Sequence, residues 1–345
     1  MRKTAKTSKG TGRPVSLKIL AEYLGLSAGT VSFVLNNAPN RSIPEPTRER
    51  VREAAKKFGY QPSQIARSLQ GQRTQTIGIL LPELGDGYHS QVLSGAADVL
   101  TRDGYFFFTA HHRHCKELVA KYSGLLHARG VEGFLVIDTH LQGSLPSPTV
   151  AVAGHGVMAG VSNVVLDHER AAELALGHLY KLGHRQIAYM RGPSLSADSE
   201  SRWRSTMRVA RSLGLRVSPR LTIGLDKDTT SPELGYPGVQ QLLQQRRKFT
   251  AVLCFNDVSA IGTVRALHDA GLKVPADVSV MGFDDVPAAE YNTPRLTTIR
   301  QPLQEMGHVA AEMLLKKIDG AKVAKIQRVN PELVVRESTR KVRPG

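Results

Sequence analysis

The sequence predicts a small all-α helix-turn-helix head, followed by an α/β body with two doubly wound, parallel-sheet lobes. Three observations predict this fold class. Positive charge is concentrated in the first 75 residues, a glycine joins two short helical patterns there, and the rest of the chain alternates strands with helices. A length of 345 residues also suits two or three domains better than one.

Composition excludes several classes of protein. Apolar residues make up 41% of the chain, which rules out a wholly disordered polypeptide. The two cysteines, Cys115 and Cys254, are too few for a disulfide framework or a four-cysteine zinc site. No apolar run approaches the ~20 residues that span a bilayer, and Lys18 and Glu22 interrupt the stretch that follows the basic start. We therefore expect a soluble cytoplasmic protein with no membrane partner.

The charge distribution points to the kind of partner. Residues 1–75 contain 14 Lys and Arg against four Asp and Glu, and the other 270 residues contain 32 against 26. A basic head on a milder body favours a polyanion, most often nucleic acid. The alternative is a solvated tail whose charge only aids solubility.

The short helices near the N-terminus have the pattern of a DNA-binding motif. Ser16 and Ser27 can cap two successive helices, and the first of these ends at Gly25. A helix-turn-helix needs a small residue where its helices touch and a tight turn between them, and Ala21 and Gly25 supply both. A third helical pattern ends at Gly59, so that three helices form the predicted head.

The body shows the alternation of an α/β protein. Its short apolar runs are separated mostly by 10–18 residues of helical pattern, which predicts parallel sheets with helices on both faces. Ligands of such sheets bind at the carboxyl ends of strands, so polar residues directly after strands are the candidates. The predicted strands are Ile77–Leu81, Tyr105–Thr109, Phe134–Ile137, Val164–Leu166, Ile187–Met190, Ala251–Phe255 and Val278–Met281.

Domain boundaries follow these changes in pattern. We expect a disordered basic arm at residues 1–13, the helix-turn-helix domain at 14–60, a hinge helix and linker at 61–75, and the body at 76–340. Within the body, the first lobe is expected at about 76–166 and 301–330, and the second at about 167–300 and 331–340.

Ordered motifs run along almost the whole chain. They include Leu17–Leu35, Thr47-Arg48, Gly59-Tyr60, Ala66-Arg67-Ser68-Leu69, Leu182–Arg185, Phe255-Asn256-Asp257, Gly282–Asp285 and Leu296–Ile299. With these motifs the chain resembles the LacI family of bacterial transcription regulators over residues 14–340. The resemblance implies a homodimer on a pseudo-palindromic double-stranded DNA operator. Its second helices would enter two adjacent major grooves, while paired hinge helices open the minor groove between them.

The resemblance assigns base reading to the second helix. Ala28, Gly29 and Phe33 fall at the positions that face base edges. The first two offer no side-chain hydrogen bond, and Phe33 offers only apolar contact, such as with a thymine methyl group. Phe33 could instead be a core aromatic residue. The residues expected near phosphates are Ser16, Ser27, Ser32, Asn36 and Thr47.

The resemblance also assigns roles in the hinge. Leu69 matches the family's apolar lever, which wedges into a base step and kinks the duplex. Ala66 and Gln70 would lie against the floor of the minor groove. Leu69 could instead simply pack against its partner helix.

The body resembles periplasmic sugar-binding proteins, which implies a small polar effector, a sugar or related metabolite, bound between the lobes. Arg202, Asn256 and Asp284 match the family's ligand-binding residues, and the Arg–Asp pair would clamp hydroxyl or carbonyl groups. Asp284 could instead cap a helix or bridge the lobes to Arg202. Tyr88, in the loop after the first strand, is a candidate aromatic platform, and Gln301 is a candidate at a lobe crossover.

Catalysis and metal binding are not expected. In the run His111–Cys115, at most His112 and His114 share one face of an extended chain, which is too few ligands for a metal. The sequence contains no nucleophile elbow, phosphate loop or acid pair, so we expect neither an enzyme nor a cofactor. The rival interpretation is a solute-binding or α/β enzyme domain with an incidental basic arm. The helix-turn-helix pattern favours an effector-controlled regulator instead, most simply a repressor.

Overall fold

The computed structural model describes residues 15–35, 42–60, 73–85, 87–141, 143, 145–154, 158–225 and 235–342. The chain divides into two compact units, Met1–Thr74 and Gln75–Gly345, which are described separately. In the described part of the chain no single helix is long and apolar enough to cross a membrane. The first two helices pass that test only when taken together, across a bend of 107°.

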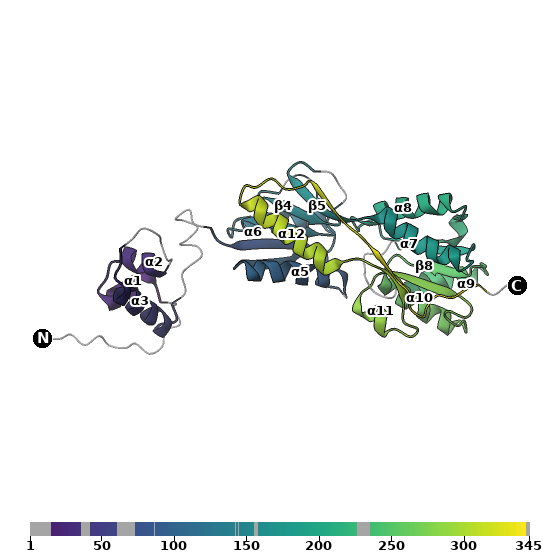
Figure 1. Ribbon diagram of the computed structural model, residues 1–345, viewed down its shortest axis with the longest axis horizontal. Coiled ribbons are helices and arrows are strands. Elements are labelled where there is room, and N and C mark those ends of the chain that lie inside the picture. The colour runs from purple at the N-terminus through teal and green to yellow at the C-terminus, as the bar shows by residue number, and fades with distance from the viewer. Residues whose placement is uncertain are drawn as a thin grey trace. The chain divides into compact units, whose positions relative to one another are not determined.

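The first unit contains three helices around one small core (Figure 1). They are α1 (Leu17–Leu24), α2 (Ala28–Leu35) and α3 (Glu45–Lys57). Their apolar faces meet, as the helical spacing predicts. The buried residues of this core are Leu20, Ala21, Leu24, Val31, Val34, Val51, Ala54 and Ala55.

The predicted caps and turn explain where α1 and α2 begin and end. The Ser16 Oγ accepts the backbone N–H of Ile19 at 3.4 Å, and the Ser27 Oγ accepts that of Thr30 at 3.1 Å. Gly25 follows α1 with φ 67°, a left-handed conformation that glycine adopts without steric cost. The helix-turn-helix prediction is confirmed.

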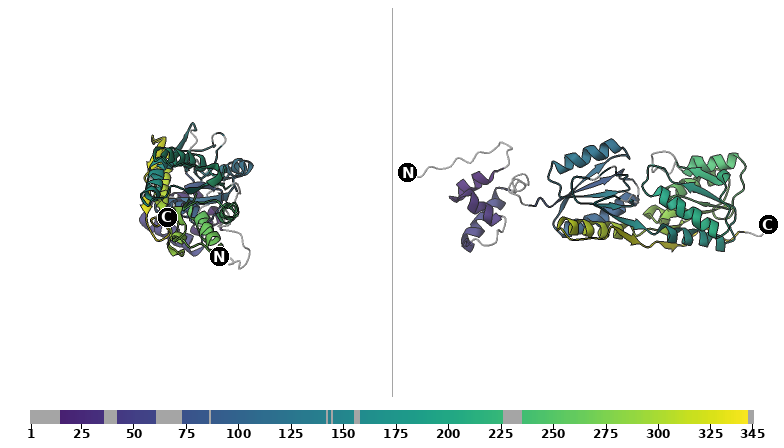
Figure 2. Two further views of the ribbon diagram at one scale, coloured as in Figure 1. Left: turned by 90° about the vertical axis from the view of Figure 1, so that its right-hand side faces the viewer. Right: turned by 90° about the horizontal axis from the view of Figure 1, so that it is seen from above.

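The second unit is the α/β body, and its first lobe is built on a parallel sheet in the order β11-β5-β4-β3-β1-β2. Helices α5 (Tyr88–Arg102) and α12 (Leu303–Ile318) cover one face, and α6 (Lys116–His127) covers the other, as Figure 2 shows. The strands are β1 (Thr76–Leu81), β2 (Phe106–His111), β3 (Gly133–Ile137), β4 (Thr149–Val152), β5 (Val161–Leu166) and β11 (Ile326–Val329).

The second lobe has a sheet in the order β12-β10-β9-β8-β6-β7, in which only the β10–β12 pair is antiparallel. One face packs against α7 (His168–Lys181) and α8 (Ser199–Ser212), and the other against α9 (Gly235–Gln244) and α10 (Asp257–Asp269). The strands are β6 (Ile187–Arg191), β7 (Thr222–Gly224), β8 (Ala251–Leu253), β9 (Ser279–Asp284), β10 (Thr297–Arg300) and β12 (Glu332–Val334); the 3-10 helix η1 (Pro219–Leu221) and α11 (Pro287–Tyr291) complete the lobe.

The chain crosses between the lobes three times, from β5 into α7, from β10 into α12 and from β11 to β12. Figure 1 shows the last of these as the yellow segment that joins them. Each crossing leaves the carboxyl end of a strand, so the residues that follow strands gather where the lobes meet. The predicted two-lobe, parallel-sheet fold class is confirmed.

Candidate functional site

The outward face of α2 carries the residues expected to read bases. Ala28 and Gly29 are exposed and Phe33 is 36% exposed, whereas Val31 and Val34 are buried on the opposite face. The interpretation of Phe33 as a core aromatic residue is therefore wrong. Its ring lies beside Gly29, because a Cβ built there would be 3.8 Å from the ring. This recognition face presents apolar surface.

Apolar exposure continues onto α1. Ile19 is 52% exposed and Tyr23 is 55% exposed. The Tyr23 ring meets the edge of Phe58 with centroids 4.7 Å apart, and its hydroxyl lies 3.2 Å from Nζ of Lys57. Tyr23 is thus held beside the Lys57 ammonium group, which could also bind a DNA phosphate.

The polar residues expected near phosphates differ in their hydrogen bonds within the protein and in their burial. Ser16 and Ser27 act as helix caps, and the Ser27 hydroxyl also lies 2.9 Å from that of Thr30. Ser32 and Thr47 are half-buried. Asn36, Ala66, Leu69 and Gln70 lie outside the described residues.

In the body, a group of polar residues gathers where the lobes meet, and we call it the interlobe site. The first lobe contributes Tyr88, His89 and Asp138, and the second lobe contributes His168, Asp198, Arg202 and Asp284. All except Tyr88 are buried, and the Tyr88 hydroxyl oxygen is itself enclosed without a hydrogen-bond partner in the described structure. Tyr88 begins α5 rather than lying in a loop.

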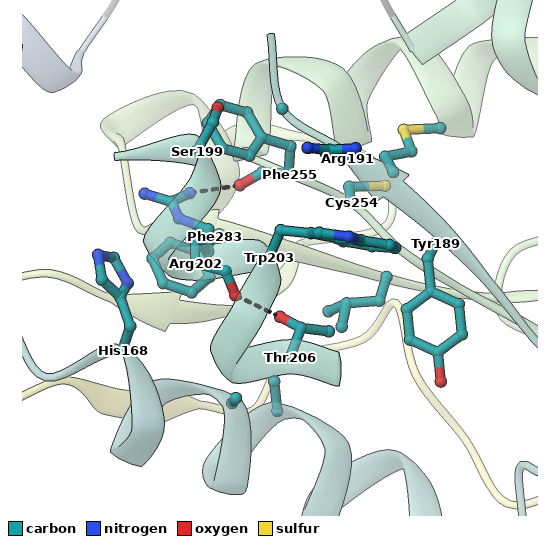
Figure 3. A pocket seen from close by; sticks show the side chains of 15 residues that line it. His168, Tyr189, Arg191, Ser199, Arg202, Trp203, Thr206, Cys254, Phe255 and Phe283 are labelled. Carbon is teal, nitrogen blue, oxygen red and sulfur yellow. Dashed lines mark hydrogen bonds between the residues drawn. The ribbon is translucent and has the colours of Figure 1, made fainter. Parts of the chain in front are cut away.

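Arg202 is the centre of a chain of short hydrogen bonds in the second lobe. Its Nη2 donates to Oδ2 of Asp198 at 2.6 Å, and Oδ1 of Asp198 lies 2.5 Å from Nε2 of His168. The other amino group, Nη1, donates to the backbone oxygen of Phe255 at 2.6 Å, drawn in Figure 3. The guanidinium carbon lies 4.5 Å from the ring centre of Phe255 and 3.8 Å from that of Phe283.

Asp284 lies next to these hydrogen bonds and is held by Gln301, which the sequence analysis named as a candidate effector-binding residue. The Gln301 Nε2 donates to Oδ1 of Asp284 at 2.6 Å, while Nη1 of Arg202 lies 3.9 Å from the same oxygen. Burial raises the pKa of Asp284 to about 7, although Arg202 and Gln301 lower it. Arg202 and Asp284 both belong to the second lobe, so the interpretation of Asp284 as a bridge between the lobes is wrong. The residue that precedes α11 is Val286, so the interpretation of Asp284 as a helix cap is wrong as well.

Asp138 makes the connection between the lobes. Its Oδ1 accepts the hydroxyl of Ser196 at 3.0 Å and the backbone N–H of Ala197 at 2.7 Å, just before α8. Nearby, Gly87 has φ 106°, and a Cβ built there would lie 2.4 Å from a methyl carbon of Val286 in the second lobe. The two lobes are therefore in contact at Asp138 and at Gly87.

A small cavity adjoins the site inside the second lobe. It has a volume of about 30 Å³, room for one or two water molecules, and Trp203, Phe255 and Phe283 form part of its wall (Figure 3). Among the described residues, Nε of Arg202 and Oγ of Ser199 are buried there without a hydrogen-bond partner.

Polar residues next to the site make bonds within the second lobe. The Asn256 Oδ1 accepts the backbone N–H of Ser259 at 2.9 Å and caps α10, so this oxygen is already used within the protein. Asp257 and Asp285 also have partners within the protein. Asp257 accepts from Thr298 and from the backbone of Val286, and Asp285 pairs with Arg300 and Arg336.

Of the residues that form the interlobe site, the sequence predicted Tyr88, Arg202 and Asp284, and it also predicted Gln301, which contacts Asp284. It missed the other four members. Asp138 and His168 could have been found, because each follows an apolar strand as Asp284 does. Asp198 stands four residues before Arg202, the spacing of a helical ion pair. His89 carried no signal beyond its place beside Tyr88.

The histidine-rich run of the first lobe forms no cluster of three or more potential metal ligands within the described ranges. Nε2 of His112 lies 2.9 Å from Oγ1 of Thr139. Burial, with help from the neighbouring charge of His114, lowers the pKa of His112 to about 4, so this ring is neutral at pH 7.

Comparison with known families identifies both units. Residues 16–63 match the family of bacterial regulatory proteins of the lacI type, and residues 176–339 match a periplasmic binding protein-like domain. The chain is 32% identical to the transcriptional regulator RegA of Clostridium saccharobutylicum, over 94% of this chain and 99% of RegA. It is 31% identical to the regulator GalR of Escherichia coli, over 94% of this chain and 95% of GalR.

Solved structures agree with these matches. A lac repressor dimer bound to operator and the anti-inducer ONPF has a TM-score of 0.84 and 28% identity, over 95% of this chain and all of that one. The regulator CelR in complex with cellobiose has a TM-score of 0.68 and 26% identity, over 94% of this chain and 99% of that one.

Proposed function

This chain belongs to the lacI family of bacterial regulatory proteins, and from that premise we propose that it is a repressor controlled by a small polar effector at the interlobe site. It is a DNA-binding transcription regulator, and the relatives described above are named as regulators rather than enzymes. One observation carries the proposal: the same chain has an exposed recognition face on α2 and a buried polar site to which both lobes contribute.

On the DNA side, we propose that two copies of the chain bind a pseudo-palindromic operator, as a two-fold dimer would. Phe33 would contact a thymine methyl group, because the recognition face offers apolar surface in place of hydrogen bonds. Backbone amides at the start of α2 and nearby cations would hold phosphates. Leu69 would open the central minor-groove step. The protein would act in the cytoplasm, where its DNA target lies.

On the effector side, we propose that a sugar or related polar molecule binds among Tyr88, Asp138, Arg202 and Asp284. A ligand that contacts both lobes favours one arrangement of the lobes over another, by its difference in affinity for the two. Coupling of about 1–3 kcal/mol between effector and operator would change operator affinity by roughly 5–150-fold. The lobe arrangement would act on DNA through residues 61–75, which precede β1.

Operator selection from random DNA, followed by fluorescence anisotropy, tests the proposal. A dimer that makes ~6–10 phosphate contacts should lose roughly 10³–10⁵ in affinity between 50 and 200 mM salt. A salt slope that corresponds to one or two contacts, or no preferred sequence, would favour the solute-binding alternative.

A further inference from the structure

We infer that the effector binds through hydroxyl or amino groups and carries no phosphate or carboxylate at the interlobe site. This inference rests on the proposed function, since it assumes that the interlobe site is where the effector binds. It narrows the ligand from any polar metabolite to an uncharged or amino-bearing polyol, such as an unphosphorylated sugar or an amino sugar.

The first argument is the balance of fixed charge. Asp138, Asp198 and Asp284 are all buried at the site, at 8%, 4% and 5% exposure. Of the residues that form it, only Arg202 carries a positive charge at every physiological pH. An anionic ligand would bring a further negative charge into a poorly solvated region that already holds Asp138 and Asp198, together with Asp284, whose pKa of about 7 leaves it partly ionised at neutral pH.

The second argument is that Arg202 is already engaged. Both of its terminal nitrogens donate hydrogen bonds of 2.6 Å within the protein, one to Asp198 and one to the Phe255 backbone. The rings of Phe255 and Phe283 also pack against its guanidinium group. A phosphate or carboxylate that approached both terminal nitrogens would therefore have to share or displace the bonds that they already make.

The third argument concerns helix N-termini, which are the usual backbone sites for anions. Two such termini in the second lobe are capped by the protein's own acceptors. Asp167 accepts the N–H of Arg170 at the start of α7, and Asn256 caps α10. Asp138 accepts the N–H of Ala197, two residues before α8 begins, whereas α8 itself has no capping side chain. A phosphate at the start of α7 or α10 would have to displace the capping group.

The groups left for a ligand are mostly acceptors. Within the described structure, Oδ2 of Asp284 receives no hydrogen bond, and Oδ2 of Asp138 has only Nε2 of His89 at 3.8 Å, too far for a direct bond. The buried Tyr88 hydroxyl, which can donate or accept, has no partner. Ligand hydroxyl or amino groups would satisfy these oxygens, whereas phosphate oxygens would be repelled by the ionised carboxylates.

The test measures thermal shifts and calorimetric affinities for a defined panel. It contains neutral mono- and disaccharides, the 2-amino analogues and phosphate esters of the same sugars, and inorganic phosphate. We expect at least one neutral or amino sugar to bind, its phosphate ester to bind at least 10-fold more weakly, and inorganic phosphate to give no shift beyond that of chloride at equal ionic strength. Tighter binding of any phosphate ester, a shift by inorganic phosphate, or failure of every neutral and amino sugar to bind would overturn the inference.

Two variants provide a second measurement that does not depend on which ligand of the panel binds best. Asp138→Asn removes one carboxylate of the site and weakens the hydrogen bond to the backbone N–H of Ala197. The affinities for the phosphate esters and for inorganic phosphate should therefore rise at least threefold. Asp98→Asn makes the same change of charge at a side chain of α5 that is 68% exposed, and should change nothing. Equal phosphate binding in both variants would overturn the inference. Operator binding is measured on the same samples, so loss of DNA recognition would count against the proposed function and not against this ligand class.

Discussion

The recognition face of α2 and the interlobe site use opposite means to recognise a partner. The recognition face is exposed and apolar, with Phe33 beside Gly29. The interlobe site is buried and charged, and its members hydrogen-bond to one another. A partner of the recognition face therefore meets exposed side chains, whereas a ligand of the interlobe site must compete with hydrogen bonds that the protein already makes. Substitutions on the recognition face should alter DNA binding alone. Substitutions at the interlobe site should alter stability as well.

The largest effect is expected from Arg202→Ala. This change leaves Asp198 and Asp284 buried without their cation, which should lower the free energy of unfolding of the body by about 3–5 kcal/mol. Urea unfolding measures this loss. The control is Arg204→Ala, because Arg204 is 67% exposed and pairs with Glu200 at the surface, where a loss below about 1 kcal/mol is expected. Equal losses in the two variants would mean that the Arg202 network is not structural.

The next effect separates ligand binding from DNA binding. Asp284→Ala should weaken the effector by about 1.5–3 kcal/mol, the usual contribution of a hydrogen bond to a charged group. Operator affinity without effector should remain unchanged. Calorimetry with the effector and anisotropy with the operator measure the two quantities, and Glu290→Ala, exposed on α11, is the control. Unchanged effector affinity in Asp284→Ala would remove this carboxylate from the binding site.

A smaller effect concerns pH. Burial raises the pKa of Asp284 from 3.8 to about 7, so its stabilising contribution is complete below about pH 4 and is lost as the pH rises through 7. The free energy of unfolding of the wild type should therefore fall relative to that of Asp284→Asn between pH 5 and 7.5, by about 1 kcal/mol per unit at most. Parallel pH profiles for the two proteins would show that this carboxyl does not titrate as its burial implies.

The smallest effect tests the recognition face. Replacing operator thymines one at a time by deoxyuridine removes a single methyl group, which should cost about 0.8 kcal/mol at the thymine that Phe33 contacts. Phe33→Ala should lose that sensitivity while its unfolding free energy stays within about 0.5 kcal/mol of the wild type. Ile19→Ala, a similar exposed truncation on α1, should keep the sensitivity. If no thymine distinguishes Phe33→Ala from the wild type, Phe33 does not read a methyl group.

Most of the fold could be predicted from local patterns. Ser16, Gly25 and Ser27 fix α1 and α2 through capping and turn preferences that act within a few residues. Strands β4, β7, β10, β11 and β12 are absent from the predicted strands, because three or four residues are too short to show a period. Their place in the sheets depends on pairing with distant segments.

The interlobe site was predictable only in part, for a related reason. Position after a strand pointed to Asp284 and could equally have pointed to Asp138. The same rule also pointed to Asn256, and a polar residue between a strand and a helix can in addition cap the helix, as Asn256 does. The bond between His168 and Asp198 joins residues 30 positions apart, and no local pattern encodes it.

The approach of Gly87 to Val286 has a practical consequence for anyone who wishes to retune this regulator. Gly87 has no side chain, so the backbone at this position can approach Val286 of the other lobe closely. Any side chain at position 87 would act as a spacer between the two lobes. Replacing Gly87 by Ala, Ser and then Val would insert spacers of increasing size, at some strain because of the φ of 106°. Each would hold the lobes further apart without occupying the ligand's own contacts. The variants should differ step by step in operator affinity without effector, while they keep the same ligand preference. A set of biosensors built on this regulator would need such a series.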